Sequence, residues 1–221
     1  MNTGIFSPRA NVNDRFIPDY AKLAEVVTAC KTLGMKVVLT SGSYDIIHEG
    51  HQDYLEAAKA LGDFLVVGLD SDAKIRQRKQ KSEYDLRPFF SQNVRVRQLA
   101  GQRPVDVITL KDVDQEKWAL IKVVKPHVLQ ATKETYSPEE LEALKEFCGE
   151  VVVQEPFATQ GTSEHMRRMM RGGAQEFRDS LLQTLPESVS NDVRDALTRR
   201  IPEIIEDVLG RLHATSAQGG G

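Results

Sequence analysis

Short, almost purely apolar runs alternate along the chain with longer segments whose apolar positions recur every three or four residues. The run FLVVGLD (64–70) is typical of a strand buried on both faces of a parallel sheet. Strands are predicted at 36–41, 64–70, 105–110, 127–131 and 150–155. Helices are predicted at 18–34, 51–62, 88–100, 114–124 and 137–147, with a further one beginning at 162. This alternation predicts an α/β fold built on an open, five-stranded parallel sheet.

The chain is predicted to divide into four parts. Residues 1–18 are polar and irregular and form a tail or a strap, and residues 19–171 form the α/β domain. The stretch RGGAQ (171–175) is predicted to be a hinge. Beyond it, residues 172–213 form two or three amphipathic helices, and residues 214–221 form a disordered tail. The helical extension is too small for much core of its own, so it is expected to pack on the main domain or on a second subunit.

Basic residues are concentrated in one window of a chain whose formal net charge is -3. Residues 74–103 contain nine Lys or Arg and two acidic residues, a balance of +7. This window indicates either a localised anion site or a solvated helix face. Its only aromatic residues are Tyr84, Phe89 and Phe90, and no recognition motif accompanies them, so nucleic acid is not an expected partner.

Composition indicates a cytoplasmic protein. No apolar run approaches the roughly 18–20 residues of a membrane span, and the first residues lack the basic-then-apolar pattern of a signal peptide. The two cysteines, Cys30 and Cys148, are far apart, and each lies in a predicted helix. Neither a disulfide framework nor catalytic use of a cysteine is expected, and a membrane partner is not expected either.

The stretch GSYDIIHEGH (42–51), directly after the first predicted strand, carries the clearest chemistry. Ligands of parallel sheets bind at the carboxyl ends of strands. Gly42 lets the backbone approach a ligand closely, and the helix that begins near Gly50 offers free N–H groups and a positive dipole end. His48 and His51 would face an anion there, since imidazole donates to phosphate oxygens. Phosphate binding is favoured, with zinc binding or a structural role of the histidines as alternatives. No metal site is predicted.

This stretch resembles the G-x-F-D-x-x-H-x-G-H signature of the cytidylyltransferase-like nucleotidyltransferases. The similarity continues through YLEAAKALGDFLVVGLDSDAKIRQRK (54–79) and covers residues 20–170. The pattern is closest to those of the heptose-phosphate adenylyltransferases and glycerol-phosphate cytidylyltransferases. The resemblance implies a doubly wound, Rossmann-like parallel sheet, in agreement with the alternation above.

The resemblance also implies an enzyme and its substrates. A substrate phosphate would attack the α-phosphate of a nucleoside triphosphate bound with Mg²⁺, and pyrophosphate would leave. AMP or CMP would thereby pass to a small phosphomonoester such as a sugar phosphate or glycerol phosphate. Positioning and charge stabilisation would carry the catalysis.

The resemblance assigns roles around the first strand. His48 and His51 match the signature histidines, which hold the triphosphate and stabilise the transition state, and Asp45 matches the Asp that would orient the loop. Lys36 falls where related enzymes often carry a phosphate-binding Lys, although it could be an ordinary strand-edge residue. The implied nucleotide-binding residues are Ser41, Gly42, Tyr44, Asp45, Gly50, Gln130, Thr162 and Ser163.

The segment LRPFFSQNVR (86–95) is similar to the family's R-P…R element. It places Arg87 and Arg95 near the substrate, Arg95 as a catalytic residue unless it is an exposed helical Arg. Asp72 follows the second strand, and Lys79 lies in a loop that often reaches the acceptor phosphate. Together with Arg87, these two residues form the predicted substrate-phosphate group.

The segment GTSEHMRRM (161–169) resembles the family's S-T-[ST]-x-I-I-x-x-[IR] element. There Thr162 and Ser163 would present hydroxyl and N–H groups to the nucleotide phosphates, or form a plain helix cap, or both. Gly161 replaces the first hydroxyl residue of the element, and His165 stands where an apolar residue is expected.

The turn LQATKET (129–135) departs most from the family pattern, because Gln130 and Ala131 stand where relatives usually have KG-like or GDDW-like residues. A second hypothesis therefore stays open, in which the chain is a non-catalytic, nucleotide-binding relative that acts as a regulatory or assembly module. The apolar stripes of the C-terminal helices favour a homodimer. The choice between ATP and CTP also stays open.

Overall fold

The computed structural model describes the backbone of residues 4–7, 10–79, 87–133, 135–155 and 162–217. Within these ranges it leaves out the side chains of residues 79, 162–167, 206 and 208–217. The chain divides into two compact units, Met1–Thr159 and Gln160–Gly221.

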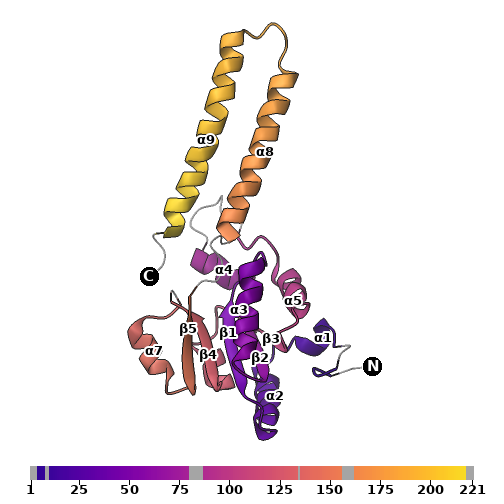
Figure 1. Cartoon of the computed structure of the whole chain (residues 1–221), viewed down its shortest axis with the longest axis vertical. Coiled ribbons are helices and arrows are strands. Elements are labelled where there is room, and N and C mark those ends of the chain that lie inside the picture. Colours follow the sequence, from indigo (N-terminus) through magenta and orange to yellow (C-terminus); the bar gives the residue numbers. More distant parts are fainter. Residues whose placement is uncertain (1–3, 8–9, 80–86, 134, 156–161, 218–221) are drawn as a thin grey trace. The chain divides into compact units, whose positions relative to one another are not determined.

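The first unit is built on a parallel sheet of five strands in the order β3-β2-β1-β4-β5 (Figure 1). The strands are β1 Val37–Gly42, β2 Phe64–Asp70, β3 Val107–Lys111, β4 Val128–Thr132 and β5 Glu150–Gln154. Every residue of β2 is buried, as its unbroken apolar run predicts. The predicted α/β fold with a Rossmann-like five-stranded parallel sheet is confirmed.

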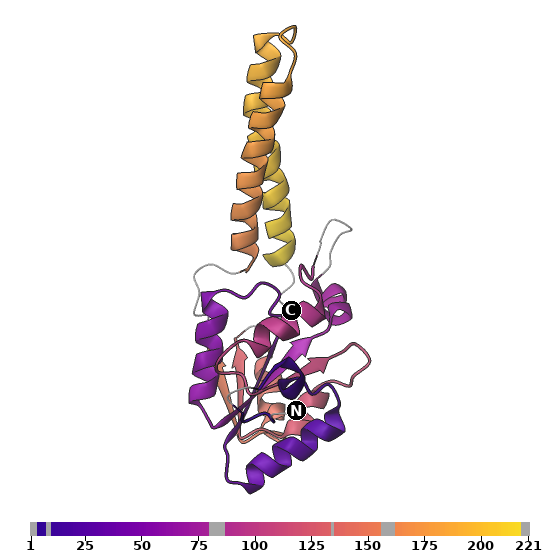
Figure 2. The same ribbon diagram turned by 90° about the vertical axis from the view of Figure 1, so that its right-hand side faces the viewer.

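Helices cover both faces of this sheet. They are α1 Val12–Arg15, α2 Tyr20–Thr32, α3 Glu49–Ala60, α4 Asp72–Lys79, α5 Gln92–Ala100, α6 Ala119–Val124 and α7 Pro138–Leu144. Alternate strand residues separate two hydrophobic cores. One core joins the sheet to α2, α6 and α7, and the other joins it to α3 and α5. Figure 2 shows α2 and α3 on opposite sides of the strands.

Helices α5 and α6 begin four and five residues later than predicted, and helices α1 and α4 were not predicted. Helix α5 begins at Gln92, after its N-cap Ser91, and α6 begins at Ala119, because Trp118 has a positive φ of 63° and stops the helix there. Helix α4 was not predicted because it is strongly polar. Ile75 is its buried apolar residue, which is too little to give a helical pattern of apolar positions.

The segment before α2 lies against the domain as a strap. Ile17 is buried, its N–H donates to the Ile108 carbonyl at 2.8 Å, and Phe16 forms a parallel bridge to Ile108. Of the two expectations for this segment, tail or strap, the structure shows the strap for the residues that it describes near α1.

The second unit consists of two long helices, α8 Thr162–Thr184 and α9 Asn191–Ala217, which lie side by side (Figures 1 and 2). The Arg194 guanidinium joins them at their connection by donating to the carbonyls of Leu182, Leu185 and Pro186. The predicted hinge at RGGAQ lies inside α8, which runs through it without interruption. Two glycines cost a helix about 1 kcal/mol each relative to alanine, which weakens it but does not end it.

The boundary between the units therefore falls after Thr159 rather than at residue 171. Helix α9 also extends through residues 214–217, which were expected to belong to a disordered tail. Within the described part of the chain, no helix is both long and apolar enough to cross a membrane.

Candidate functional site

The candidate site lies where the order of the strands reverses, at the carboxyl ends of β1 and β4. These strands pair through Val38–Val128 and Leu39–Leu129, and the described register continues no further toward their carboxyl ends. Beyond this point the chain leaves β1 toward α3 on one side and leaves β4 toward α7 on the other. A crevice at such a reversal is where open parallel sheets bind their ligands.

Two imidazoles meet at the start of α3. His48 is the N-cap residue of this helix, with extended backbone angles, and His51 lies in its first turn. Their ring centroids are 4.1 Å apart, and both side chains are half-buried. Gly50, which lies between the two histidines in the sequence, is buried. The predicted pair is therefore brought together, at the end of a helix whose dipole favours an anion.

Tyr44 supports this pair from within the protein. Its ring is 2% exposed and lies 5.4 Å from the His51 ring, centroid to centroid. Burial, with a smaller contribution from Tyr54, raises the pKa of Tyr44 well above its ordinary value, so the phenol stays neutral. Gly42 leaves room for this ring, since a Cβ there would lie only 3.0 Å from Tyr44 Cε2. Tyr44 itself has a positive φ of 44°, which turns the chain sharply after β1.

Asp45 anchors the loop after β1 to another segment of the chain. Its carboxylate is 6% exposed and accepts the N–H groups of Phe89 and Phe90, each at 2.9 Å. This contact joins the loop after β1 to the segment that precedes α5. Asp45 is thus a positioning residue rather than a ligand-binding one in this structure.

Arg95 is fully buried and is surrounded by protein acceptors. Its guanidinium donates to the carbonyls of Ser43 (2.6 Å), Asp70 (2.8 Å) and Phe90 (3.0 Å), and to Asp72 Oδ1 (2.7 Å). Neither the predicted catalytic role nor the exposed helical Arg that was its alternative matches this environment. The geometry gives Arg95 a positioning role, because its donors are used within the fold.

The structure describes the contacts of Asp72 in the predicted substrate-phosphate group, and that group stays a prediction. The Asp72 carboxylate accepts from Arg95, and the Asp72 N–H donates to Gln92 Oε1 at 3.1 Å. Arg87 is half-buried at the start of a described segment. Lys79 is the last residue of α4, and its side chain lies outside those that the structure describes.

Gln130 is tied into the protein rather than open to a base. It is 1% exposed, and its Nε2 donates to the Tyr54 carbonyl at 3.0 Å. The Thr40 hydroxyl donates to the Gln130 carbonyl at 3.1 Å and bonds the Tyr54 hydroxyl at 2.9 Å. These contacts join β1, α3 and β4 where the strand ladder ends. Ser41, half-buried, lies beside this point on the opposite face of the sheet.

Of the remaining predicted residues, the structure places Lys36 and leaves Thr162 and Ser163 untested. Lys36 precedes β1, and its N–H donates to Asp63 at the amino edge of the sheet. The expectation that it shares the site with the histidines is wrong, because six residues of strand place it about 20 Å from Gly42 at about 3.3 Å per residue. Thr162 and Ser163 are the first residues of α8 in the other unit, with side chains that are not described, so their role stays a prediction.

Sequence reasoning missed an ionic cluster at the carboxyl ends of β2 and β3. Asp70 is fully buried and pairs with Arg78 (2.8 Å) and with Lys111 (3.3 Å). Burial alone would raise the pKa of Asp70, but the charges of Lys111 and Arg78 outweigh it and lower that pKa. Burial lowers the pKa of Lys111, and the charges of Lys74 and Arg78 add to this effect against the opposing charge of Asp70. The sequence carried a signal for this cluster, because β2 and β3 each end on a charged residue, Asp70 and Lys111.

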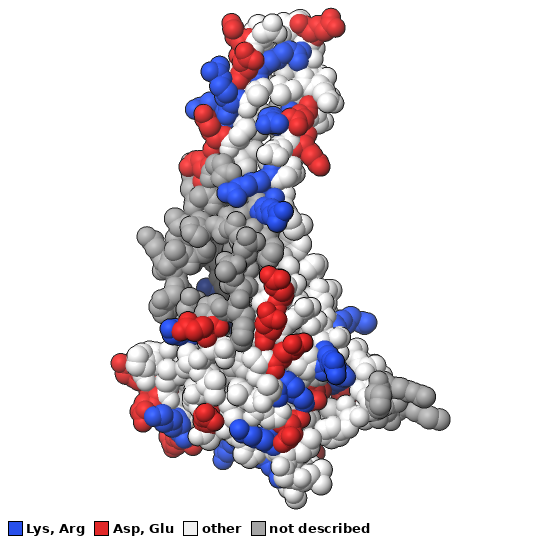
Figure 3. Space-filling model, viewed as in Figure 1, with Lys and Arg blue, Asp and Glu red and all other residues white. Residues whose placement is uncertain are grey.

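The basic window 74–103 is therefore divided by the fold. Arg95 is buried, Arg78 pairs with Asp70, and Arg97 is exposed on α5. On the face that Figure 3 shows, acidic and basic side chains are interspersed over the first unit. Among the described residues, no three His, Cys, Asp or Glu side chains converge as metal ligands.

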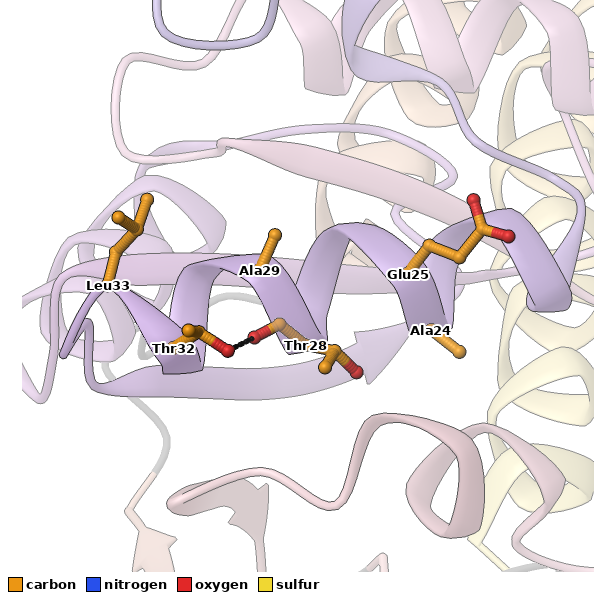
Figure 4. Close-up of a pocket in the computed structure, with 6 residues that line it drawn as sticks. All are labelled: Ala24, Glu25, Thr28, Ala29, Thr32 and Leu33. Atoms are coloured by element: carbon orange, nitrogen blue, oxygen red, sulfur yellow. Dashed lines mark hydrogen bonds between the residues drawn. The ribbon is translucent and has the colours of Figure 1, made fainter.

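A shallow hollow of about 690 Å³ lies elsewhere, on the outer side of α2. Figure 4 shows that its lining comes from this helix and the residue after it: Ala24, Glu25, Thr28, Ala29, Thr32 and Leu33. The drawn hydrogen bond, from the Thr32 hydroxyl to the Thr28 carbonyl, lies within the helix. This surface therefore lacks the convergent polar groups that a small-molecule site needs.

The fold is that of a doubly wound α/β protein, and a pair of imidazoles lies at its strand reversal. A model of the Cytidylyltransferase-like family matches residues 39–194, which is more than half of the chain. The chain belongs to this family of nucleotidyltransferases.

Curated relatives agree with this membership. The bifunctional protein HldE of Wolinella succinogenes is 39% identical over 107 residues, which cover 48% of this chain and 22% of that protein. HldE of Geotalea uraniireducens is 32% identical over 167 residues, which cover 74% of this chain and 33% of that protein. The chain thus spans a third or less of the length of these two relatives.

A solved structure shows the same fold. Pantoate-beta-alanine ligase from Francisella tularensis, complexed with beta-gamma ATP and beta-alanine, matches with a TM-score of 0.50 and 10% identity. The match covers 83% of this chain and 85% of that one. At this identity the likeness concerns the fold alone.

Proposed function

We propose that the chain transfers AMP or CMP from a nucleoside triphosphate to a small phosphomonoester, such as a sugar phosphate or glycerol phosphate, and releases pyrophosphate. The observation that carries the proposal is the pair of imidazoles, 4.1 Å apart, at the start of α3 and at the strand reversal. Family membership and the match to the bifunctional HldE proteins support it.

The proposed chemistry is an in-line displacement at phosphorus. An oxygen of the acceptor phosphate forms a bond to the α-phosphorus, while the bond from that phosphorus to the bridging oxygen of pyrophosphate breaks. Pyrophosphate leaves with the electron pair and the negative charge, which Mg²⁺ bound to the triphosphate helps to neutralise.

His48 and His51 would donate hydrogen bonds to phosphate oxygens that gain charge during this step, and the dipole of α3 would add to their effect. Tyr44 beneath His51 and Asp45 beside the loop would hold the imidazoles in place before substrate arrives. Such preorganised donors are worth about 10²–10³ in rate when one of them is removed.

Pyrophosphate release tests the proposal. The full chain with Mg²⁺ is incubated with each of ATP, CTP, GTP and UTP, against heptose 1-phosphates, glycerol 3-phosphate and other small phosphate esters. Release that requires one acceptor and falls at least 10²-fold in His51→Ala is expected. Gln52→Ala is the matched control, because Gln52 is the exposed neighbour of His51 on the same helix. Its rate should stay within about twofold of the unchanged chain.

A second candidate function has one observation in its favour. Gln130, in the altered turn after β4, is bonded to the Tyr54 carbonyl instead of facing the crevice. A non-catalytic, nucleotide-binding relative would keep the histidine pair and lose this half of the site. Such a protein would show a nucleotide-dependent rise in melting temperature that His48→Ala removes, with no pyrophosphate release from any acceptor.

A further inference from the structure

Three basic side chains gather around one buried carboxylate at the carboxyl ends of β2 and β3. Arg78 Nη2 lies 2.8 Å from Asp70 Oδ2, and Lys111 Nζ lies 3.3 Å from Asp70 Oδ1. Lys74 Nζ donates to the Asp112 carbonyl at 3.0 Å. The Asp70 side chain is 1% exposed, whereas those of Lys111 and Arg78 are 24% and 53% exposed. The cations therefore lie between the carboxylate and solvent.

The cluster carries more positive than negative charge. Asp112, the other carboxylate here, accepts from the Ser71 hydroxyl and from the Val113 N–H, both at 2.8 Å. Lys74 bonds the Asp112 carbonyl, not its carboxylate. Asp70 is thus the carboxylate that faces all three cations, and the mutual repulsion of Lys74, Arg78 and Lys111 is part of what lowers the pKa of Lys111. A bound anion would relieve this repulsion.

The cluster borders the histidine loop. One nitrogen of the Arg95 guanidinium bonds both the Asp70 carbonyl and the Ser43 carbonyl, at 2.8 and 2.6 Å, so the end of β2 and the loop after β1 are adjacent. The Lys111 side chain also packs over Gly68 of β2. A Cβ on Gly68 would lie 2.9 Å from Lys111 Cδ and 2.8 Å from Ser41 Oγ. Lys111 therefore approaches β1 at the residue before Gly42.

We propose that Lys74, Arg78 and Lys111, held by Asp70, form a subsite for a phosphate group, and that this phosphate is the acceptor's. The proposal rests on the proposed function, for which it names the acceptor-binding residues. Arg pairs with phosphate oxygens through its planar fork, and Lys acts as a compact charge, so the three together match a phosphate dianion. Asp70 keeps the cations in place before the ligand arrives, which lowers the entropy that binding must overcome.

Calorimetric titration of the full chain with inorganic phosphate tests the subsite. Lys111→Met and Arg78→Gln should each weaken phosphate binding about tenfold or more, since a charge-assisted hydrogen bond is lost. Arg76→Gln is the matched control, because Arg76 is exposed on the same helix α4 and its loss changes net charge equally. Its effect should stay below about twofold. If Lys111→Met fails to fold, Arg78→Gln still tests the subsite, because the Arg78 side chain is half exposed and its loss should leave the fold intact.

Two results would overturn the subsite itself. The first is wild-type binding of phosphate weaker than about 10 mM, and the second is equal weakening in Arg76→Gln and Lys111→Met. Phosphate affinity that is the same in Lys111→Met, Arg78→Gln and the unchanged chain would also overturn the subsite.

Nucleotide distinguishes the two sources of phosphate. Titration in saturating ATP or CTP should leave phosphate binding intact, and His51→Ala should lose nucleotide affinity while it keeps phosphate affinity. Competition between nucleotide and phosphate would assign the cluster to the triphosphate and overturn the acceptor assignment. The titrations need no turnover, so a chain that releases no pyrophosphate would refute the proposed function while the subsite is still measured.

Discussion

Asp72 and Arg95 form an ion pair, 2.7 Å from Oδ1 to Nη2, in which the guanidinium has no solvent exposure. The same guanidinium bonds the carbonyls of Ser43, Asp70 and Phe90, so one side chain joins the loop after β1, the end of β2 and the segment before α5. The residue that the family resemblance placed among the catalytic groups therefore holds together the backbone on which the histidines stand.

Replacing Arg95 by Met should lower the free energy of unfolding by about 3–5 kcal/mol. The loss leaves the Asp72 charge and three carbonyls without their donor, and breaking a buried pair costs about this much. Urea unfolding measures it. Arg97→Met, on the exposed side of the same helix, should change stability by about 0.5 kcal/mol or less. An Arg95→Met protein as stable as the control, but inactive, would return Arg95 to a catalytic role.

Asp45→Ala should destabilise the protein by about 2 kcal/mol, because the N–H groups of Phe89 and Phe90 lose a charged acceptor. Asp45→Asn should cost about half of this, since an amide has one oxygen to accept with. Hydrogen exchange gives the local readout. The amides of Phe89 and Phe90 should exchange faster in both variants, and unchanged exchange at these two positions would contradict the proposed anchoring.

Much of the fold was predictable because burial and strand identity depend on local pattern. The run 64–70 becomes β2 with the predicted bounds, and all its residues are buried. The histidine pair was equally readable, since His48 and His51 lie three residues apart at a helix start. Lys36 was misplaced because the sequence pattern gives proximity in the chain, whereas the direction of the strand decides which edge of the sheet a residue reaches.

The positions of the Arg95 and Gln130 side chains could not be predicted, because their hydrogen-bond partners are distant in the sequence. Arg95 bonds Ser43, 52 residues away, and Gln130 bonds Tyr54, 76 residues away. A motif indicates that a polar residue stands near a site, but the number of protein acceptors around it decides whether it faces the ligand. Lys111 and Asp70 went unnoticed for the same reason, since they become neighbours through the register of β2 and β3.

Alanine at Gly172 and Gly173 should stabilise α8. A Cβ at either position has nothing within 4 Å, and both residues are helical. Each substitution should therefore add about 0.5–1 kcal/mol to the stability of the helical unit. Circular dichroism melting of the double variant measures the gain. A drop in activity or a lower melting temperature would support the hinge that the sequence suggested.

Stability should fall at high pH through Tyr136. Burial, with the charges of Tyr54 and Glu140, raises the pKa of Tyr136 to about 12. Since the unfolded phenol ionises near pH 10, the contribution is fully present below pH 10 and is lost between about pH 10 and 12. Tyr136→Phe removes it. The stability difference between the two proteins should therefore shift by about 2–3 kcal/mol in favour of Tyr136→Phe over this range. A pH-independent difference would contradict the burial of this hydroxyl.

A homodimer through the second unit stays a prediction, and its exposed apolar side chains give it a test. Phe177, Met169 and Ile204 are 64%, 70% and 55% exposed on α8 and α9. If these residues meet a second copy, Phe177→Glu should halve the mass measured by light scattering, because a buried unpaired charge is costly. Asp179→Lys, an exposed charge reversal one half-turn away on α8, is the control. Equal masses in all three proteins would exclude this interface.

The short pairing between β1 and β4 has a mechanical consequence. Among the described residues two register pairs join these strands, against six between β1 and β2. We therefore expect β1 and β4 to separate more easily than the other neighbouring strands. The hydrogen bonds of Thr40, Tyr54 and Gln130 hold the two strands together where their pairing ends. A ligand bound at the carboxyl ends of β1 and β4 would therefore contact the line of the sheet that has the fewest described strand-pairing contacts.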